Sequence, residues 1–352
     1  MKDHQPESSE HSLLSRRSAI KNIGIVAGAS ALTTITGCEQ RPAPSGGAEV
    51  NRRPVASDEE YVWLSAVANL PMFVARDHPA LMKAATELGV KATIAGPNTL
   101  DIPGLVAAIE QTAARRPAGM MVVGWDPSAL IYPINRAVES GIPVICVDAD
   151  VPMGKRMTFV GTDWYELGVR QGEEMVKALN GRKGKVSLQG LIAQYIDQEA
   201  FRGFRSVAEK AGLTVLEPQE DKGNIGEATR VAAAVIQAYP DLAGMAGFDS
   251  ESGPGMGQAI KEAGKAGRLV ATCVDGEAQI LQLVKEGVLT AAVCQKRELF
   301  TYYGLKALYD LVHSQIKFTP DDKSLGVFPA PASINTGTYT VTRENVEPLL
   351  RS

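Results

Sequence analysis

The sequence predicts an α/β protein with two doubly wound parallel sheets, each covered by helices on both faces. From Tyr61 to about residue 294, short runs rich in Val, Ile and Ala alternate with longer segments of helical period. The short runs are continuously apolar, which is typical of strands buried on both faces of a parallel sheet. The chain has 352 residues, 45% of them hydrophobic and 22% charged, and this length accommodates two domains.

The apolar runs predict ten strands. Each run is short and is bounded by Gly, Pro or charged residues, as strands usually are. We expect strands near residues 60–67, 91–95, 119–123, 143–147, 157–160, 186–190, 213–216, 243–247, 269–274 and 290–294.

The segments between the strands carry their apolar residues on one helical face, and most of them close at Gly or Pro. We expect helices over residues 79–89, 102–117, 129–141, 164–181, 225–240 and 255–264. Ten strands could also close into a single barrel. However, the pattern restarts at the charged turn NGRKGK, residues 180–185, and this restart favours two separate halves.

The first forty residues have the features of a bacterial export signal. Arg16 and Arg17 precede a modest apolar run that ends in small residues and the tetrapeptide ITGC. Paired arginines predict the twin-arginine route, with the general secretory route as the alternative. ITGC predicts removal of residues 1–37 and a lipid on Cys38, and the alternative is a plain signal peptide with an incidental cysteine. Residues 38–57, rich in Pro, Gly, Ser and charge, predict a flexible tether.

Composition and motifs argue against several classes of function. A formal net charge of -4 predicts no basic surface for nucleic acid. No run of about 18 apolar residues follows the first forty positions, so no spanning helix is expected there. Cys146, Cys273 and Cys294 lie inside apolar strands, which favours small buried side chains over metal or redox roles. No Cys-x-x-Cys, close His pair or G-x-G-x-x-G pattern occurs, so we expect neither a metal nor a cofactor.

Two apolar runs end in the same three residues, Cys-Val-Asp. Asp148 follows one predicted strand and Asp275 follows another, in different halves of the chain. In doubly wound sheets the ligand crevice lies at the carboxyl ends of the strands, which makes both acids candidate ligand contacts. Taken singly, each acid could instead cap the next helix or form an ordinary turn.

Other predicted strand ends carry aromatic and polar side chains. They are Phe73, Trp125, Asp126, Phe248, Asp249 and Gln295. Aromatic faces stack on the C–H bonds of a sugar ring, while carboxylates and amides pair with hydroxyls that both donate and accept hydrogen bonds. The residue types therefore favour a sugar or a cyclic polyol.

Four segments carry a resemblance to a known family. They are NLPMFVARDHPALMKAATELG, in which Asn-x-Pro-x-Phe precedes a helix, IPVICVDADV, VGTDWYELGVRQGEEMVKAL, and LVATCVDGEAQILQLVKEGVLTAAVCQ. In order and spacing, over about residues 58–342, they resemble the periplasmic sugar-binding proteins of the ribose-binding type. The resemblance implies the type I periplasmic binding protein fold, with two lobes joined by a hinge of three crossovers.

The resemblance also implies ligand contacts at particular residues. By position these are Phe73, Asp148, Asp275 and Gln295, with Phe248 where the family often has Asn. Trp125 and Asp126 stand on a loop where the family usually carries Asn, and they could reshape that side of the pocket.

Two departures concern arginines. Ala149 and Gln198 stand where the ribose binders have Arg, which argues against ribose itself while keeping a sugar-like ligand. Arg202 could replace one lost donor, although an Arg on a helix is more often a surface residue.

The resemblance implies discontinuous lobes, with crossings near 161–164, 294–297 and 325–328. The N-terminal lobe would comprise residues 58–162 and 296–326, the C-terminal lobe residues 163–295 and 327–342, and the tail residues 343–352. The lobes would close on a ligand because each supplies part of one set of hydrogen bonds.

The function implied by the resemblance is capture of a sugar or polyol and its delivery to the membrane permease of an ABC transporter. We expect a lipid-anchored monomer at the periplasmic face of the inner membrane or at the outer cell surface. A receptor for a membrane sensor kinase is an alternative that the sequence does not separate. An exported enzyme is a weaker one, since no Gly-x-Ser-x-Gly occurs and neither His78 nor His313 falls on a predicted site loop.

Overall fold

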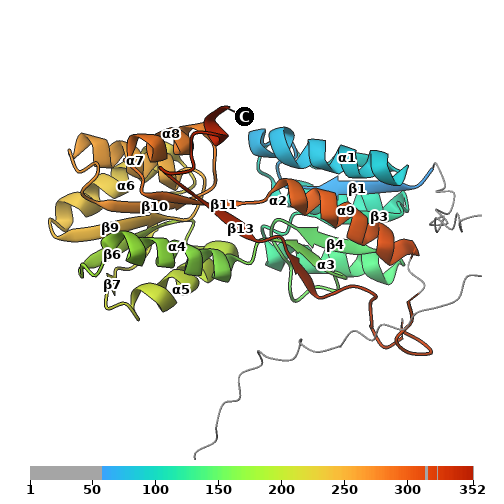
Figure 1. Cartoon of the computed structure of the whole chain (residues 1–352). Helices are drawn as coiled ribbons and strands as arrows, with labels where there is room; N and C mark the ends of the chain where they lie inside the picture. Colours follow the sequence, from blue (N-terminus) through green and yellow to red (C-terminus); the bar gives the residue numbers. More distant parts are fainter. Residues whose placement is uncertain (1–57, 314–315, 323, 352) are drawn as a thin grey trace, which may run out of the picture. The chain divides into compact units, whose positions relative to one another are not determined.

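The computed structural model describes residues 58–313, 316–322 and 324–351. The predicted signal peptide, the tether and Cys38 lie outside the described residues. Two separate β-sheets organise the described chain (Figure 1), and we call each sheet with its covering helices a lobe.

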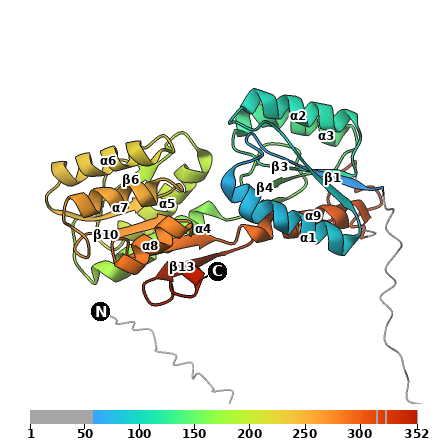
Figure 2. The same cartoon turned by 90° about the horizontal axis from the view of Figure 1, so that it is seen from above.

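The sheet of the N-terminal lobe has the strand order β12-β5-β4-β3-β1-β2, and all its pairings are parallel. Figure 2 shows α2 and α3 on one face of this sheet and α1 and α9 on the other. The strands are β1 (Glu60–Leu64), β2 (Lys91–Ala95), β3 (Gly119–Val122), β4 (Val144–Val147), β5 (Phe159–Gly161) and β12 (Ser333–Asn335). The helices are α1 (His78–Leu88), α2 (Ile102–Ala114), α3 (Pro127–Glu139) and α9 (Glu298–His313), with the π-helical turn η1 (Phe73–Asp77) before α1.

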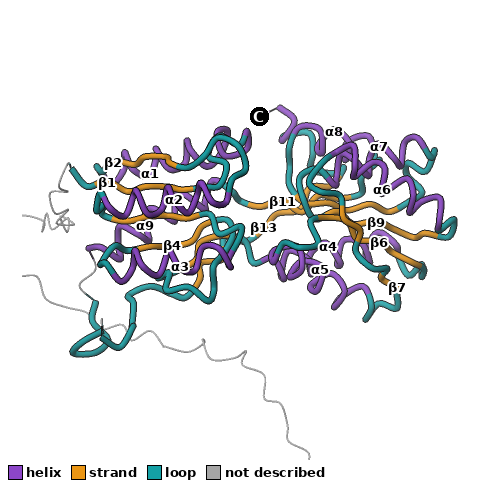
Figure 3. Tube along the Cα trace, turned by 180° about the vertical axis from the view of Figure 1, so that it is seen from behind, coloured by secondary structure: helices purple, strands orange, loops and turns teal. Residues whose placement is uncertain are grey.

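The C-terminal lobe has the strand order β13-β11-β10-β9-β6-β7, and β8 also pairs with β6. Figure 3 shows its strands running between two layers of helix. The strands are β6 (Lys185–Gly190), β7 (Thr214–Val215), β8 (Gln219–Glu220), β9 (Leu242–Gly247), β10 (Val270–Val274), β11 (Ala291–Gln295) and β13 (Thr338–Thr342). The helices are α4 (Trp164–Leu179), α5 (Tyr195–Ala208), α6 (Ile225–Ala238), α7 (Ser252–Glu262) and α8 (Ala278–Glu286).

The continuous apolar character of the strands follows from burial on both faces. In β1, Val62 and Leu64 pack in the layer of α2 and α3, while Tyr61 and Trp63 pack in the layer of α1 and α9. Successive side chains of a strand point to opposite faces, so a strand with helices on both sides is apolar at every position.

The predicted strands and helices are confirmed, with ends that shift by a few residues. Strand β1, for example, ends at Leu64 and not at residue 67. The barrel alternative is wrong, because the strands form two sheets. The short strands β8, β12 and β13 were not predicted, and β13 runs antiparallel to β11 at the edge of a sheet expected to be wholly parallel.

The chain changes from one sheet to the other after Gly161, after Gln295 and after Asn335. The third change was predicted near 325–328, and this position is wrong because Ser333–Asn335 still pairs with β5 of the N-terminal sheet. The predicted tail is also corrected, since Val346 is buried in the core of the C-terminal lobe.

Several glycines permit close packing between helices. A Cβ on Gly168 of α4 would lie 1.9 Å from the carbonyl oxygen of Ala200, and one on Gly203 of α5 would lie 2.1 Å from that of Tyr165. Helices α4 and α5 therefore approach backbone to backbone. The Gly-rich stretch of α7 likewise permits close packing against α6, because a Cβ on Gly255 would lie 2.3 Å from the Cβ of Ala228.

Among the described helices, none has both the length and the apolar character needed to cross a bilayer. Within the same residues, no group of three or more His, Cys, Asp or Glu side chains is arranged to hold a metal ion.

Candidate functional site

The two Cys-Val-Asp segments have the same local structure in the two lobes. Cys146 and Cys273 are buried under one helical layer of their sheets, and the valines that follow pack in the opposite layer. Asp148 then follows β4 with a φ of 66°, and Asp275 follows β10 with a φ of 68°. Few residues other than Gly adopt this left-handed conformation, although Asp tolerates it. Each carboxylate thus leaves its sheet at a sharp turn of the backbone.

In the N-terminal lobe, Asp148 belongs to a buried ion-pair triad with Arg297 and Asp77. Nη1 of Arg297 donates to Oδ1 of Asp148 at 2.9 Å, while Nε and Nη2 donate to the two carboxylate oxygens of Asp77, each at 3.3 Å. All three side chains are at least 94% buried. The triad joins the end of β4, the turn η1 and the segment after β11.

Aromatic rings pack against this triad. Phe73 and Trp125 stack with their centroids 5.6 Å apart and their planes 29° from parallel. The guanidinium of Arg297 lies 5.3 Å from the centroid of Phe73 and 5.2 Å from that of Phe300, within the range of cation–π attraction. Two of the predicted site residues, Phe73 and Trp125, are therefore in direct contact, and Phe73 also contacts Arg297.

The triad holds two acids and one base. Burial, opposed by Arg297 and reinforced by the charge of Asp148, raises the pKa of Asp77 to about 7. Burial alone would lower the pKa of Arg297, but the charges of Asp148 and then Asp77 outweigh it, so the pKa is raised and Arg297 stays a cation. The negative charge of Asp275 in the other lobe also acts to raise the pKa of Arg297.

In the C-terminal lobe, Asp275 is held by two neutral donors. Gln295 Nε2 donates to Oδ1 and Ser250 Oγ donates to Oδ2, each at 2.9 Å. Oε1 of Gln295 is buried and has no hydrogen-bond partner among the described residues. A buried acceptor without a donor is costly, so this atom is available to a hydroxyl of a ligand.

Further acids lie at the same edge of the C-terminal sheet. Ser252 Oγ donates to Oδ2 of Asp221 at 2.5 Å and also lies 3.0 Å from Oδ1 of Asp249. Burial, and then a hydrogen bond with Asp221, raises the pKa of Asp249 to about 9. Burial and the charge of Asp275 raise the pKa of Glu251 to about 7. This edge is therefore acidic, with part of its charge removed by protons.

Three other predicted site residues have structural partners. Asp126 caps α3 by accepting from the backbone N–H of Ala129, as an acid before a helix commonly does. Phe248 is fully buried between Phe201 and Phe204. Gln198, exposed on α5, donates to the carbonyl oxygen of Ile192.

Arg202 does not replace a missing donor in this structure, because it pairs with Glu199 and lies over the ring of Tyr165. Sequence reasoning missed Arg297, Asp77 and Ser250. A signal for Arg297 exists in its position two residues after Gln295, at the end of a predicted strand.

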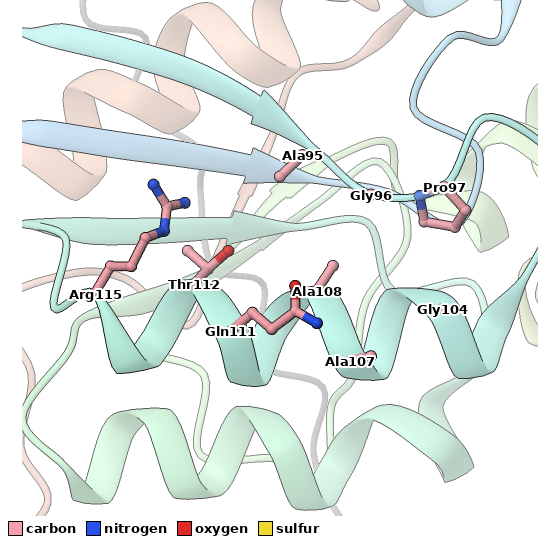
Figure 4. Close-up of a pocket in the computed structure, with 9 residues that line it drawn as sticks. All are labelled: Ala95, Gly96, Pro97, Gly104, Ala107, Ala108, Gln111, Thr112 and Arg115. Carbon is pink, nitrogen blue, oxygen red and sulfur yellow. The ribbon is translucent and has the colours of Figure 1, made fainter.

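A separate pocket of about 440 Å³ lies between the end of β2 and helix α2 of the N-terminal lobe (Figure 4). Small side chains such as Ala107 and Ala108 line it, with Gln111 and Arg115 along the helix. None of the predicted site residues lines this pocket, and no carboxylate does.

Comparison with known proteins identifies the family. Residues 62–315 match the model of the periplasmic binding protein domain. A D-ribose/D-allose-binding protein of Pseudomonas aeruginosa is 23% identical over 242 residues, which are 67% of this chain and 75% of that protein. A D-allose-binding periplasmic protein of Escherichia coli is 25% identical over 250 residues, 68% of this chain and 80% of that protein.

Solved structures extend the likeness. A sugar-binding protein of a sugar ABC transporter from Bacillus halodurans has a TM-score of 0.77 and 29% identity, covering 82% of this chain and 99% of its own. AraP, an arabinose-binding protein from Geobacillus stearothermophilus, has a TM-score of 0.73 and 32% identity, covering 83% and 99%.

The chain belongs to the periplasmic binding protein domain family. The predicted type I periplasmic binding protein fold and the resemblance to the ribose-type sugar-binding proteins are confirmed. The protein is thus an extracytoplasmic solute-binding protein and not an enzyme.

Proposed function

We propose that this protein captures a sugar or sugar-like polyol and delivers it to the permease of an ABC transporter. The observation that carries the proposal is the matched pair of acids Asp148 and Asp275. Each follows a central strand of its sheet in the same left-handed conformation, and each is at most 6% exposed. Such placement fits the Asp contacts of the family and the general position of ligands in doubly wound sheets.

The polar groups of the proposed site match hydroxyl chemistry. The carboxylates of Asp148 and Asp275 accept hydrogen bonds, and Oε1 of Gln295 is a further acceptor. A sugar hydroxyl donates one hydrogen bond and accepts others, so a ring with several hydroxyls satisfies acceptors in both lobes. Phe73 and Trp125 supply the apolar surface on which the C–H side of a ring packs.

The proposal includes the remaining predicted contacts. Asp126, Gln198 and Phe248 would face the ligand only after a change in their present partners. The names of the relatives point to pentoses and hexoses, since they bind ribose, allose or arabinose. The hinge would consist of the three segments that join the lobes, and closure on the ligand would complete its hydrogen bonds.

The lipid anchor and the export route are part of the proposal. Cys38 would carry the lipid after removal of residues 1–37, and residues 38–57 would tether the folded lobes to the membrane. The support is the sequence pattern of paired arginines followed by ITGC.

A substitution at Asp275 tests the site. Because its φ is 68°, Gly keeps the backbone conformation while removing the carboxylate. We expect Asp275→Gly to weaken sugar binding by at least ~2 kcal/mol, since a buried hydroxyl loses its partner. The measurement is isothermal titration calorimetry with the sugar that gives the largest rise in melting temperature in a screen of pentoses, hexoses and polyols.

The matched control is Asn180→Gly, at another position with positive φ, where α4 ends. This variant should bind as the unaltered protein does. Equal affinity of Asp275→Gly and the unaltered protein would remove Asp275 from the site, and a screen in which no sugar or polyol raises the melting temperature would refute the proposed function.

A further inference from the structure

Arg297 makes fewer hydrogen bonds than its buried guanidinium can donate. The group has five N–H donors in a planar fork. Three of them serve Asp77 and Asp148, through Nε, Nη2 and Nη1. One N–H on Nη1 and one on Nη2 have no acceptor within the described residues. The side chain is only 5% exposed, between the rings of Phe73 and Phe300, so bulk water gives these two donors little compensation.

The free donors lie beside a free acceptor. Oδ1 of Asp148 accepts from Arg297, whereas Oδ2 of Asp148 has no hydrogen bond to a described residue. The guanidinium that carries the free donors and the carboxylate that carries the free acceptor are therefore joined by one hydrogen bond of 2.9 Å, which keeps the two groups close together. Two hydroxyls on adjacent carbons fit this arrangement, because one can accept from Arg297 while its neighbour donates to Asp148.

The charges around the site disfavour an acidic ligand. Arg297 is shared by Asp77 and Asp148, and the nearby Arg76 is paired with Glu298 at 2.8 Å. Arg156, on the loop after β4, is paired with Asp150 through Nε and Nη2. Each of these three described cations thus has an acidic partner, and the negative charge of Asp275 in the other lobe also acts on Arg297.

We propose that Arg297 donates hydrogen bonds directly to the ligand and, together with Asp148, selects a neutral sugar with adjacent hydroxyls over a sugar acid. This inference rests on the proposed function. It assigns to Arg297, on the segment that joins β11 to α9, the charged guanidinium donor that Ala149 and Gln198 lack.

The test uses calorimetric titration with L-arabinose, D-ribose, D-xylose and D-galactose, and with D-galacturonate and D-glucuronate as acids. Arg297→Lys keeps the positive charge but loses the fork, and we expect about 10- to 100-fold weaker binding of every sugar that the unaltered protein binds. The matched control Arg156→Lys also loses a paired fork in the same lobe, and its affinity should stay within about twofold. The acids should bind at least about 100-fold more weakly than the neutral sugars, since buried like charges repel.

A second variant separates ligand contact from charge balance. Arg297→Met combined with Asp77→Asn removes the cation together with one of the two acids that it neutralises, so the formal charge of the triad is unchanged and only Asp148 is left without a cation. We expect this double variant to fold, as judged by circular dichroism, and still to bind at least about 10-fold more weakly.

Three results would overturn the inference alone: unchanged affinity of Arg297→Lys, recovery of full affinity in the double variant, or acids that bind as well as neutral sugars. If the unaltered protein binds none of the four sugars, the proposed function itself fails for them and the inference falls with it.

Discussion

Asp148 and Asp275 hold a backbone conformation that costs an L residue about 1 kcal/mol relative to Gly. Nothing in the packing of the strands demands a carboxylate at these positions, because the preceding cysteine and valine already complete the two faces of the sheet. The turn brings each acid out of the sheet at its carboxyl edge. An unfavourable conformation kept at two equivalent positions points to the use of the carboxylates in binding.

The ionisation of Asp249 should make the stability of the fold depend on pH. Its pKa is raised to about 9, chiefly by burial and then by Asp221, from an ordinary value near 3.8. Between these two values the folded protein holds a proton that the unfolded chain releases, so the free energy of unfolding should fall as the pH rises from about 4 to about 9.

The variant Asp249→Asn removes the ionisable carboxyl group, so residue 249 no longer makes the free energy of unfolding depend on pH. Asn can keep the bonds that Oδ1 accepts from the backbone N–H groups of Glu251 and Ser252. We expect it to raise the free energy of unfolding at pH 9 by more than ~1 kcal/mol and to leave that at pH 5 nearly unchanged. Urea denaturation at the two pH values measures this, with Asp310→Asn on the exposed face of α9 as control. A variant with the same pH slope as the unaltered protein would contradict the assignment.

At the scale of elements, two of the three segments that join the two sheets are hydrogen-bonded to each other. Asn335 at the end of β12 donates through Nδ2 to Glu166 of α4 at 2.7 Å and accepts through Oδ1 from the N–H of Gly337 at 2.9 Å. Thr336 donates through its N–H to the carbonyl oxygen of Gly161 at 2.9 Å. The segments after β5 and β12 are thus linked side by side, as expected of a hinge that bends as one unit.

If these segments form a hinge, ligand should change the distance between the lobes. We expect the radius of gyration in small-angle X-ray scattering to fall when saturating sugar is added, because contacts to Asp148 and Asp275 together favour the closed state. Asp275→Gly at the same sugar concentration should show little change. A radius of gyration that stays constant at saturation would contradict closure.

The elements also show where prediction from sequence stops. The ten strands were predicted because apolar runs between helical segments have few other interpretations, although β2 and β7 are only partly buried. β12 and β13 were missed because they are short edge strands with exposed or half-exposed residues such as Ser333 and Thr338, whose pattern resembles that of a loop. The antiparallel pairing of β13 with β11 depends on a long return of the chain and has no local signal.

At the scale of the whole molecule, the two lobes divide the proposed work. Each supplies one acid at a strand end, and the N-terminal lobe adds the stacked rings of Phe73 and Trp125. Neither lobe alone satisfies a ring with hydroxyls on all sides, so affinity should require both. This division agrees with the membership of the chain in the periplasmic binding protein family.

The proposed lipid anchor would determine where the whole molecule works. If Cys38 carries a lipid, Cys38→Ser should move the protein from the membrane fraction to the soluble extracytoplasmic fraction and abolish incorporation of labelled fatty acid, while sugar affinity stays the same. Unaltered protein in the soluble fraction, without label, would refute the lipid anchor and leave the binding function intact.

The sequence by itself determined the two α/β sheets, the family resemblance and the acids Asp148 and Asp275, because strand burial and strand ends leave local patterns in the chain. Only the tertiary structure decided that Arg297 lies between Asp77 and Asp148, which are 220 and 149 residues away. The physical reason is that an ion pair between distant residues depends on which segments the fold brings together, and neither partner carries a local sign of the other.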